Sequence, residues 1–131
     1  MNILVVDDNA SHLKLAHLVL SAAGHKVSNA EAAEQVFKSI EQDRPQVILL
    51  DLNLPGMDGL TLVRTLKADP RTRDIRIVAV TSYPDLFKKS DALTAGCDAY
   101  LLKPIDTRAL PQQVEAVAAQ APARKERETL L

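Results

Sequence analysis

The sequence contains no tryptophan, and aromatic residues make up only 3% of its 131 residues. Because 47% of the residues are apolar, any buried core has to be built from aliphatic side chains. A chain of this length buries about 65–70% of the surface that its unfolded form exposes, so it can fold without a metal or a disulfide. We expect one domain.

Cysteine is also scarce. The only one, Cys97, excludes an internal disulfide and is typical of a reducing compartment. No sequence feature beside Cys97 indicates an activated thiol, so we expect it to act as a small buried apolar residue.

An excess of basic charge is missing as well. The 16 basic and 17 acidic residues leave a net charge of −1, which argues against direct binding of nucleic acid. No apolar run approaches the roughly 18 residues of a membrane span. The chain begins with a strand-like run rather than a charged region and a signal-peptide core, so we expect a cytoplasmic protein without a membrane partner.

Short apolar runs alternate with helical patterns along the chain. Residues 47–50 form the most informative run, because it leads directly into Asp51 and is followed by a Pro55-Gly56 turn. Such a run predicts a strand that is buried on both faces, as in a parallel sheet. The predicted strands cover residues 3–6, 25–28, 47–50, 75–80 and 99–102, with 25–28 at an edge.

The helices between these strands have identifiable ends. Asn9 and Asn29 are candidates to cap the first two helices, and Gly24 and Gly96 are plausible stops. Prolines fit the first turn of the fourth and fifth helices, at Pro84 and Pro111. The apolar positions expected to mark these helices are Leu15, Leu18, Val19 and Ala22; Ala33, Val36, Phe37 and Ile40; Leu62, Val63 and Leu66; Leu86 and Leu93; and Leu110, Val114, Val117 and Ala121.

This alternation predicts an α/β fold with a parallel sheet, helices on both faces and right-handed crossovers. We place the domain at residues 1–120. Residues 121–131 are charged and lack an apolar stripe, so we expect a frayed or disordered tail.

Polar side chains gather at the carboxyl ends of the predicted strands. They are Asp7 and Asp8 after the first, Asp51 after the third, Thr81 after the fourth and Lys103 after the fifth. In a parallel sheet these ends share one edge, where open α/β sheets bind ligands. The sequence thus predicts an acidic pocket with one hydroxyl and one ammonium.

Three carboxylates in one pocket repel one another by several kcal/mol per pair at an effective dielectric constant of about 20. Mg²⁺ would relieve this repulsion, because it prefers oxygen ligands. The expected ligands are Asp8, Asp51 and the backbone carbonyl of Asn53, with Asp7 acting through a water. Asp51 is then a candidate nucleophile for a phosphoryl group, Lys103 and Mg²⁺ would neutralise the phosphoryl oxygens, and Thr81 could donate a hydrogen bond.

The sequence resembles the receiver domains of bacterial response regulators over about residues 2–120. The matching segments are Asp7-Asp8, Asp51, the loop 54–59, Thr81-Ser82, and Tyr100 followed by Lys103-Pro104. This resemblance implies a flavodoxin-like, doubly wound sheet of five parallel strands in the order 2-1-3-4-5 with five helices, an order that the receiver family itself exemplifies.

The resemblance also implies roles for individual residues. Asp51 corresponds to the phosphoacceptor, Asp7 and Asp8 to the acidic pair that helps to bind Mg²⁺, and Lys103 to the lysine that pairs with the phosphoryl group. Pro104 corresponds to a position usually preceded by a cis peptide bond. Thr81 and Tyr100 correspond to a switch pair, in which the hydroxyl moves toward the phosphoryl group and the ring turns inward.

The resemblance further implies a phosphorelay protein and not an ordinary enzyme: self-catalysed transfer from a histidine kinase or phosphotransfer protein, self-dephosphorylation, and a changed surface for a downstream protein. The protein would be a monomer, or a dimer on phosphorylation. Because the 11 residues after Gln120 cannot form an output domain, the chain would act by binding a partner, or it is a receiver excised from a larger protein.

Other interpretations remain open. Asp7 and Asp8 could simply stabilise the N-terminus of the first helix through its dipole, and Lys103 could form only a structural ion pair with these acids. The three histidines, at positions 12, 17 and 25, have no convincing metal-ligand spacing, so we expect solvated or half-buried side chains.

Two other functions also remain. A phosphatase of the haloacid dehalogenase type would share a strand-end aspartate and Mg²⁺, but it normally has a second aspartate where this chain has Asn53. A pseudo-receiver that binds partners without phosphorylation is disfavoured by the complete set of acids, threonine and lysine.

Overall fold

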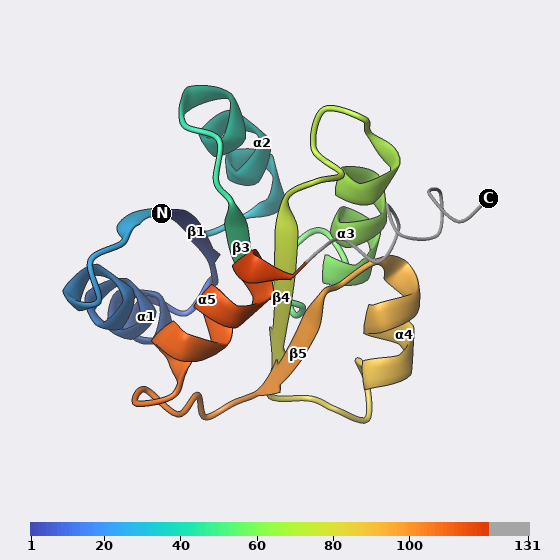
Figure 1. Ribbon diagram of the computed structural model, residues 1–131. Coiled ribbons are helices and arrows are strands. Elements are labelled where there is room, and N and C mark those ends of the chain that lie inside the picture. The colour runs from blue at the N-terminus through green and yellow to red at the C-terminus, as the bar shows by residue number, and fades with distance from the viewer. Residues whose placement is uncertain (121–131) are drawn as a thin grey trace.

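The computed structural model describes residues 1–120, in which strands and helices alternate as predicted (Figure 1). The predicted tail, residues 121–131, and the expected apolar position Ala121 lie outside the described residues. In chain order the elements are β1 (Asn2–Val6), α1 (Ala10–Ala22), β2 (Lys26–Ala30), α2 (Ala33–Gln42), β3 (Val47–Asp51), α3 (Gly59–Ala68), β4 (Arg76–Thr81), α4 (Lys89–Ala95), β5 (Ala99–Leu102) and α5 (Leu110–Ala119).

The strands form one parallel sheet in the order β2-β1-β3-β4-β5, which confirms the expected topology. β2 lies at an edge, as predicted. The chain first builds outward from β1 to β2 and then returns to place β3 on the other side of β1. This reversal sets the carboxyl ends of β1 and β3 side by side, at the position where sheets of this type bind ligands.

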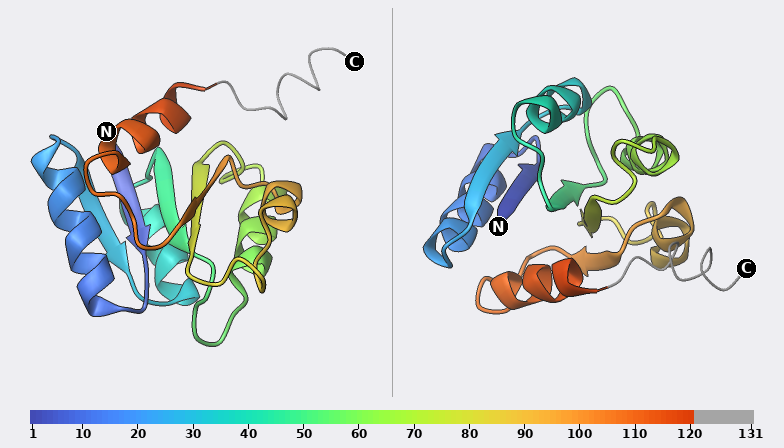
Figure 2. Two further views of the ribbon diagram at one scale, coloured as in Figure 1. Left: turned by 90° about the horizontal axis from the view of Figure 1, so that it is seen from below. Right: turned by 45° about the horizontal axis from the view of Figure 1, so that its top comes forward.

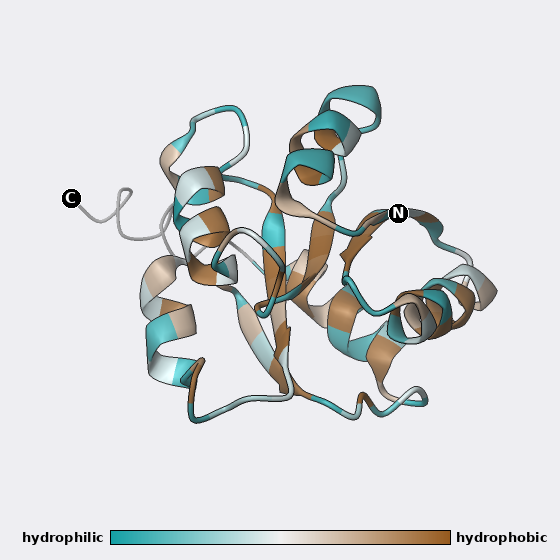
Figure 3. Cartoon of the chain, turned by 180° about the vertical axis from the view of Figure 1, so that it is seen from behind, coloured by the Kyte–Doolittle hydropathy of each residue, from teal (hydrophilic) through white to brown (hydrophobic). Residues whose placement is uncertain are grey.

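Helices cover both faces of the sheet (Figure 2). The inward-facing residues of α1 and α5 pack on one face, and those of α2, α3 and α4 pack on the other. All five residues of β3 are buried, which confirms a strand enclosed on both sides. Figure 3 shows the apolar strands in the centre of the molecule, and the buried core is almost wholly aliphatic, with Phe87 as the only buried aromatic residue among those described.

Helix α1 presents a different apolar face from the predicted one. Leu15 and Leu18 are 48% and 56% exposed, whereas Leu13, Ala16 and Leu20 are buried against the sheet. The sequence of α1 is apolar around most of its circumference, so its periodicity allows two adjacent stripes. Packing selects the stripe that has the smaller Ala16 at its centre.

The predicted helix ends are only partly correct. Asn9 caps α1, because its side-chain oxygen accepts hydrogen bonds from the N–H groups of Ser11 and His12. Asn29 does not cap α2; it lies within β2, and the N-cap of α2 is Ala32. An alanine cannot accept a hydrogen bond through its side chain, so α2 begins without that stabilisation.

The predicted position of Pro84 is wrong too. α4 begins at Lys89, and the preceding segment forms a separate turn in which the N–H groups of Leu86 and Phe87 donate to the carbonyl of Tyr83. The ring of Phe87 is buried in the core and holds this turn against the sheet, so α4 begins only after the turn. Pro111 does lie in the first turn of α5, as predicted.

None of the helices within residues 1–120 combines the length and the apolar character needed to cross a bilayer.

Candidate functional site

The predicted acidic residues meet at the carboxyl edge of the sheet. β1 ends at Val6 and β3 ends at Asp51, and Val6 pairs with Leu50 in the parallel register. Asp7 and Asp8, which follow β1, therefore come beside Asp51. One carboxylate oxygen from each of the three residues lies within 4.8 Å of the others.

The three carboxylates differ in exposure. Asp7 and Asp51 are only 6% and 7% exposed, whereas Asp8 is exposed. The cluster is thus walled by protein on one side and open to water on the other, so a small ion or ligand can approach from the side of Asp8.

Lys103 joins the buried carboxylates. Its Nζ donates hydrogen bonds to Asp7 Oδ2 at 2.7 Å and to Asp51 Oδ2 at 2.9 Å. All three side chains are 8–9% exposed, so this is a nearly buried ion-pair network. Lys103 reaches the site because β5 ends one residue earlier, next to the end of β4, where Thr81 pairs with Leu102.

The environment of Lys103 favours its charged form. Burial alone lowers its pKa, but the hydrogen bonds and negative charges of Asp7 and Asp51 outweigh that effect, so the pKa of Lys103 lies above its usual value. The ammonium therefore stays protonated at neutral pH and balances part of the acidic charge.

Backbone groups hold the carboxylates in place. Asp51 Oδ1 accepts a hydrogen bond from the N–H of Asn53 at 2.9 Å, and Asp7 Oδ1 accepts one from the N–H of Asn9 at 2.9 Å. The other oxygen of each residue faces Lys103. These side chains have little rotational freedom, and their orientation is set before any ligand binds.

Asn53 follows Asp51 at the start of the loop that leads to α3. Its N–H holds Asp51, and the residue forms an isolated bridge with Asp58. Its backbone therefore lies beside the carboxylates, in the neighbourhood that the sequence predicted for a metal ligand.

The predicted switch residues, Thr81 and Tyr100, form no hydrogen bond with the carboxylate cluster and bond elsewhere. Thr81 is fully buried at the end of β4, and its Oγ1 accepts a hydrogen bond from the N–H of Tyr83 at 2.9 Å. The hydroxyl of Tyr100 donates to the carbonyl of Phe87 at 2.5 Å. Both side chains are thus tied to the turn between β4 and α4 rather than to the carboxylates.

The peptide bond between Lys103 and Pro104 is cis, as the family resemblance implied. Cys97 is buried, as predicted. Its burial, together with the nearby charge of Asp98, raises the pKa of its thiol to about 12.

Sequence reasoning missed one member of the site, His12. Its Nδ1 lies 3.0 Å from Lys103 Nζ and 4.0 Å from Asp7 Oδ2. The spacing of the three histidines did not indicate a role for His12. Its place in the chain could have done so, because His12 lies in the first turn of the helix that begins at the acidic edge of the sheet.

A cavity of about 220 Å³ adjoins this end of the site. Its walls are mainly apolar and come from α1, the segment after β5 and the start of α5. The lining residues are His12, Leu15, Ala16, Lys103, Pro104, Ile105, Thr107 and Leu110.

The chain is similar to known signalling proteins over most of its length. The family model described as the response regulator receiver domain matches residues 3–115. The response regulator PleD of Caulobacter vibrioides is 39% identical over 104 residues, which are 79% of this chain and 23% of PleD. The chain therefore spans less than a quarter of that curated relative.

Solved structures support the same relationship. A structure described as a putative response regulator from Chloroflexus aurantiacus aligns with a TM-score of 0.84 and 31% identity, covering 91% of this chain and 98% of that one. The receiver domain of the sensor histidine kinase PA1611 from Pseudomonas aeruginosa, solved with a magnesium ion in its active-site cleft, aligns with a TM-score of 0.81 and 28% identity, covering 91% and 98%. Together with the family match over residues 3–115, these likenesses show that the chain belongs to the response regulator receiver domain family of two-component signalling systems.

Proposed function

We propose that Asp51 accepts a phosphoryl group from a phosphohistidine of a partner histidine kinase or phosphotransfer protein, and that the phosphorylated domain then binds a downstream protein differently. The observation that carries this proposal is the position of the Asp51 carboxylate, which is fixed at the carboxyl end of β3 between two further acids and the Lys103 ammonium. An aspartate in such a place is a competent nucleophile for phosphoryl transfer.

The donor set fits Mg²⁺. Oxygen ligands, a net excess of carboxylates over ammonium groups, and an exposed Asp8 are what a hard divalent cation requires. Asp8, Asp51 and the backbone carbonyl of Asn53 would hold the ion, with Asp7 acting through a water. When bound, Mg²⁺ would neutralise phosphoryl oxygens during transfer. The receiver domain of PA1611, a relative of this chain, was solved with a magnesium ion in its active-site cleft, and this supports the proposed magnesium site.

The transfer itself is a single displacement at phosphorus. An Asp51 carboxylate oxygen forms the new P–O bond while the P–N bond of the phosphohistidine breaks, and the electron pair stays with the imidazole, which takes a proton from water. Lys103 stabilises the charge on the phosphoryl oxygens. Water later attacks the same phosphorus and releases inorganic phosphate and the free carboxylate, so the domain is a self-catalysed phosphoacceptor rather than a turnover enzyme.

The response would begin at Thr81. Its Oγ1 accepts a hydrogen bond from the N–H of Tyr83, and movement of the hydroxyl toward a phosphoryl oxygen would break that bond. This movement would release the turn between β4 and α4, to which Tyr100 is also tied through Phe87. A local change in charge would thereby shift the surface formed by α4, β5 and α5.

We place the receiver domain at residues 1–120 and expect it to work in the cytoplasm. The expected partners are such a kinase or phosphotransfer protein and a downstream protein, without direct contact to nucleic acid or membrane. Phosphorylation either leaves the domain monomeric or drives dimerisation.

The test is phosphorylation by acetyl phosphate with Mg²⁺, followed by intact-mass measurement. We expect one labile phosphoryl adduct in the wild type and in Asp91→Asn, a matched change of an exposed acid on α4, and no adduct in Asp51→Asn. Omitting Mg²⁺ or changing Asp8 to Asn should slow the reaction strongly. An unmodified wild type with both acetyl phosphate and phosphorylated kinase would refute the proposal, and rapid multiple turnover of simple phosphomonoesters would indicate a phosphatase instead.

A further inference from the structure

We infer that His12 is a positioning residue for phosphoryl transfer, because its imidazole keeps the Lys103 ammonium directed at the two buried carboxylates. This inference rests on the proposed function for its consequence, but the contact itself belongs to the unphosphorylated protein. Nδ1 of His12 lies 3.0 Å from Lys103 Nζ.

The Lys103 ammonium has three N–H groups and three acceptors. They are Asp7 Oδ2 at 2.7 Å, Asp51 Oδ2 at 2.9 Å and His12 Nδ1 at 3.0 Å. An ammonium can only donate, so Nδ1 has to accept in this hydrogen bond, which requires the imidazole tautomer with its proton on Nε2. His12 completes the hydrogen bonding of Lys103 without adding charge.

The three acceptors have different fates during phosphorylation. The Asp51 carboxylate becomes an acyl phosphate and loses most of its negative charge, so one N–H of Lys103 has to move to a phosphoryl oxygen. Asp7 and His12 keep the other two N–H groups. With both in place, Lys103 needs to redirect only one hydrogen bond, and its Nζ stays beside the reacting phosphorus.

The backbone holds His12 rigidly enough for this role. Its own N–H donates to the Asn9 side chain at 3.1 Å, and the N–H of Asn9 donates to Asp7 at 2.9 Å. His12 is therefore built onto the same loop that orients Asp7. Asn9 thus links the two anchors of Lys103, which limits how far the acceptors can separate and keeps the ammonium directed at the carboxylates.

A competing explanation is that His12 only fills space beside the apolar cavity that includes Leu15 and Leu110. The two explanations differ in what they require of the side chain. A space-filling role needs volume and tolerates an apolar residue, whereas the positioning role needs an acceptor where Nδ1 now lies.

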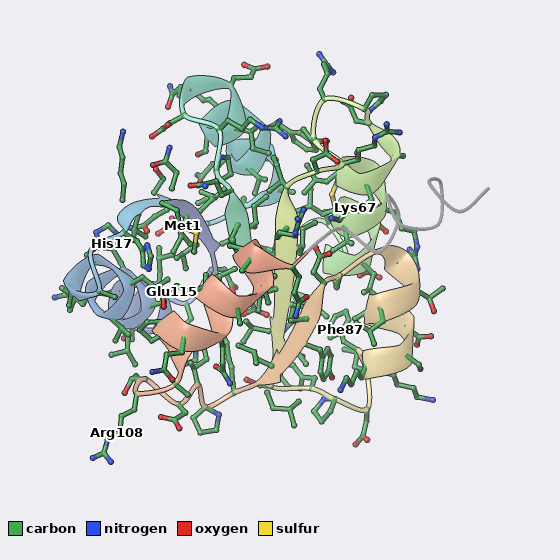
Figure 4. The ribbon with its side chains drawn as sticks, viewed as in Figure 1. Met1, His17, Lys67, Phe87, Arg108 and Glu115 are labelled. Atoms are coloured by element: carbon green, nitrogen blue, oxygen red, sulfur yellow. The ribbon has the colours of Figure 1, made fainter. Side chains whose placement is uncertain are left out.

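Two substitutions separate these roles. His12→Asn places an amide oxygen close to the position of Nδ1, and His12→Leu places a methyl group there. The matched controls are His17→Asn and His17→Leu, because His17 also lies on α1 (Figure 4) but bonds to Asn29 through its Nδ1 at 2.9 Å. All four variants are measured in the full chain with Mg²⁺.

The first measurement is the rate constant of phosphorylation by acetyl phosphate at saturating Mg²⁺. We expect His12→Leu to lower it roughly three- to tenfold, the loss expected when one partly exposed hydrogen bond to a charged group is removed. His12→Asn should remain within about twofold of the wild type, and both His17 variants should be unchanged.

The second measurement needs no phosphorylation. In protein labelled with ¹⁵N on lysine, the Lys103 ammonium is identified by its absence in Lys103→Met, and its proton exchange with water is followed by NMR. We expect faster exchange in His12→Leu and near-wild-type exchange in His12→Asn. This signal would not change if His12 only filled space.

Equal phosphorylation rates and equal ammonium exchange in His12→Leu and the wild type would overturn the inference. So would an equal loss in His12→Asn and His12→Leu. If the wild type accepts no phosphoryl group at all, the proposed function fails, while ammonium exchange still decides whether His12 holds Lys103.

Discussion

The Lys103 ammonium donates a hydrogen bond to the Asp51 carboxylate across 2.9 Å, although the two residues are 52 positions apart in the chain. Both side chains are 9% exposed. At the carboxyl edge of the sheet in the unphosphorylated protein, this contact links the end of β3 to the segment after β5. The proposed phosphoacceptor is therefore also part of the structural framework.

Replacing Lys103 by Met should destabilise the protein in Mg²⁺-free buffer by about 1–3 kcal/mol, since two buried carboxylates lose their shared counter-charge. Urea denaturation measures this change. Adding Mg²⁺ should recover part of the loss, because the cation supplies the missing positive charge. A variant as stable as the wild type without Mg²⁺ would contradict the assigned ion-pair network.

The same pair predicts a dependence on alkaline pH. The pKa of Lys103 is raised in the folded protein, so its contribution to stability is complete below the unfolded value of about 10.4 and is lost as the pH rises through the folded value. The difference in unfolding free energy between the wild type and Lys103→Met should be constant from pH 7 to 9 and shrink above pH 10. Comparing the two proteins cancels the titration of other groups.

Lys67, which lies on α3 (Figure 4), forms a second nearly buried network. Its Nζ donates to the carbonyl of Ile75 at 2.8 Å and to Asp98 Oδ2 at 3.1 Å, and its side chain is 9% exposed. Lys67→Met should lower stability by about 2–4 kcal/mol, because the Asp98 carboxylate loses its counter-charge and keeps only its hydrogen bond from the N–H of Ile77, and the carbonyl of Ile75 loses its lysine donor. Chemical denaturation measures the change.

The matched control for Lys67 is Lys26→Met. Lys26 pairs with Asp43 at 2.8 Å, but its side chain is 71% exposed, so the loss should stay within about 0.5 kcal/mol. Equal effects of the two substitutions would show that burial does not govern these ion pairs.

Gly59 at the start of α3 lies against the backbone of Leu52. A Cβ atom at position 59 would come within 2.6 Å of both the Cα and the carbonyl oxygen of Leu52. Gly59→Ala should therefore lower stability by about 2–3 kcal/mol, because backbone has to move. The loop that it would displace carries Asn53, so phosphorylation by acetyl phosphate should slow as well.

Gly24→Ala provides the comparison for Gly59. Gly24 has a φ of +95° but open space around its missing side chain, so only the backbone conformation is penalised, at about 1 kcal/mol. Thermal unfolding of the two variants distinguishes them, and a larger loss for Gly24→Ala would argue against the close contact at Leu52.

Cys97 should be almost inert in the folded protein. Burial raises the pKa of its thiol to about 12, so very little thiolate is present at pH 8. Alkylation by iodoacetamide should be at least about a hundredfold slower in native buffer than in denaturant. A native rate close to the denatured one would show that the thiol is accessible. Reaction monitored by intact mass needs no further control, because Cys97 is the only cysteine.

The sequence predicted most of the fold because its signals were local. Short apolar runs that end in Asp7, Asp51 and Thr81 marked buried parallel strands, and their carboxyl ends had to share an edge. The strand order came from the resemblance to receiver domains, since nothing in the runs themselves states which strand lies beside which.

Local signals failed where one residue suits two different positions. Asn29 suits both a cap and an edge strand, and the sheet placed it in β2. Pro84 suits the first turn of a helix, but burial of Phe87 in the core fixed a separate turn before α4. In both cases a contact distant in sequence outweighed a local preference.

The sequence alone determined which chemical groups stand at the carboxyl ends of the strands, because strand period and chain direction follow from the residues themselves. Only the tertiary structure decided how those groups bond. In the folded protein α1 packs with Leu15 and Leu18 exposed, and Nδ1 of His12 lies 3.0 Å from Nζ of Lys103. That contact joins positions 91 residues apart and depends on the rotation of one helix against the sheet, which no local pattern in the sequence specifies.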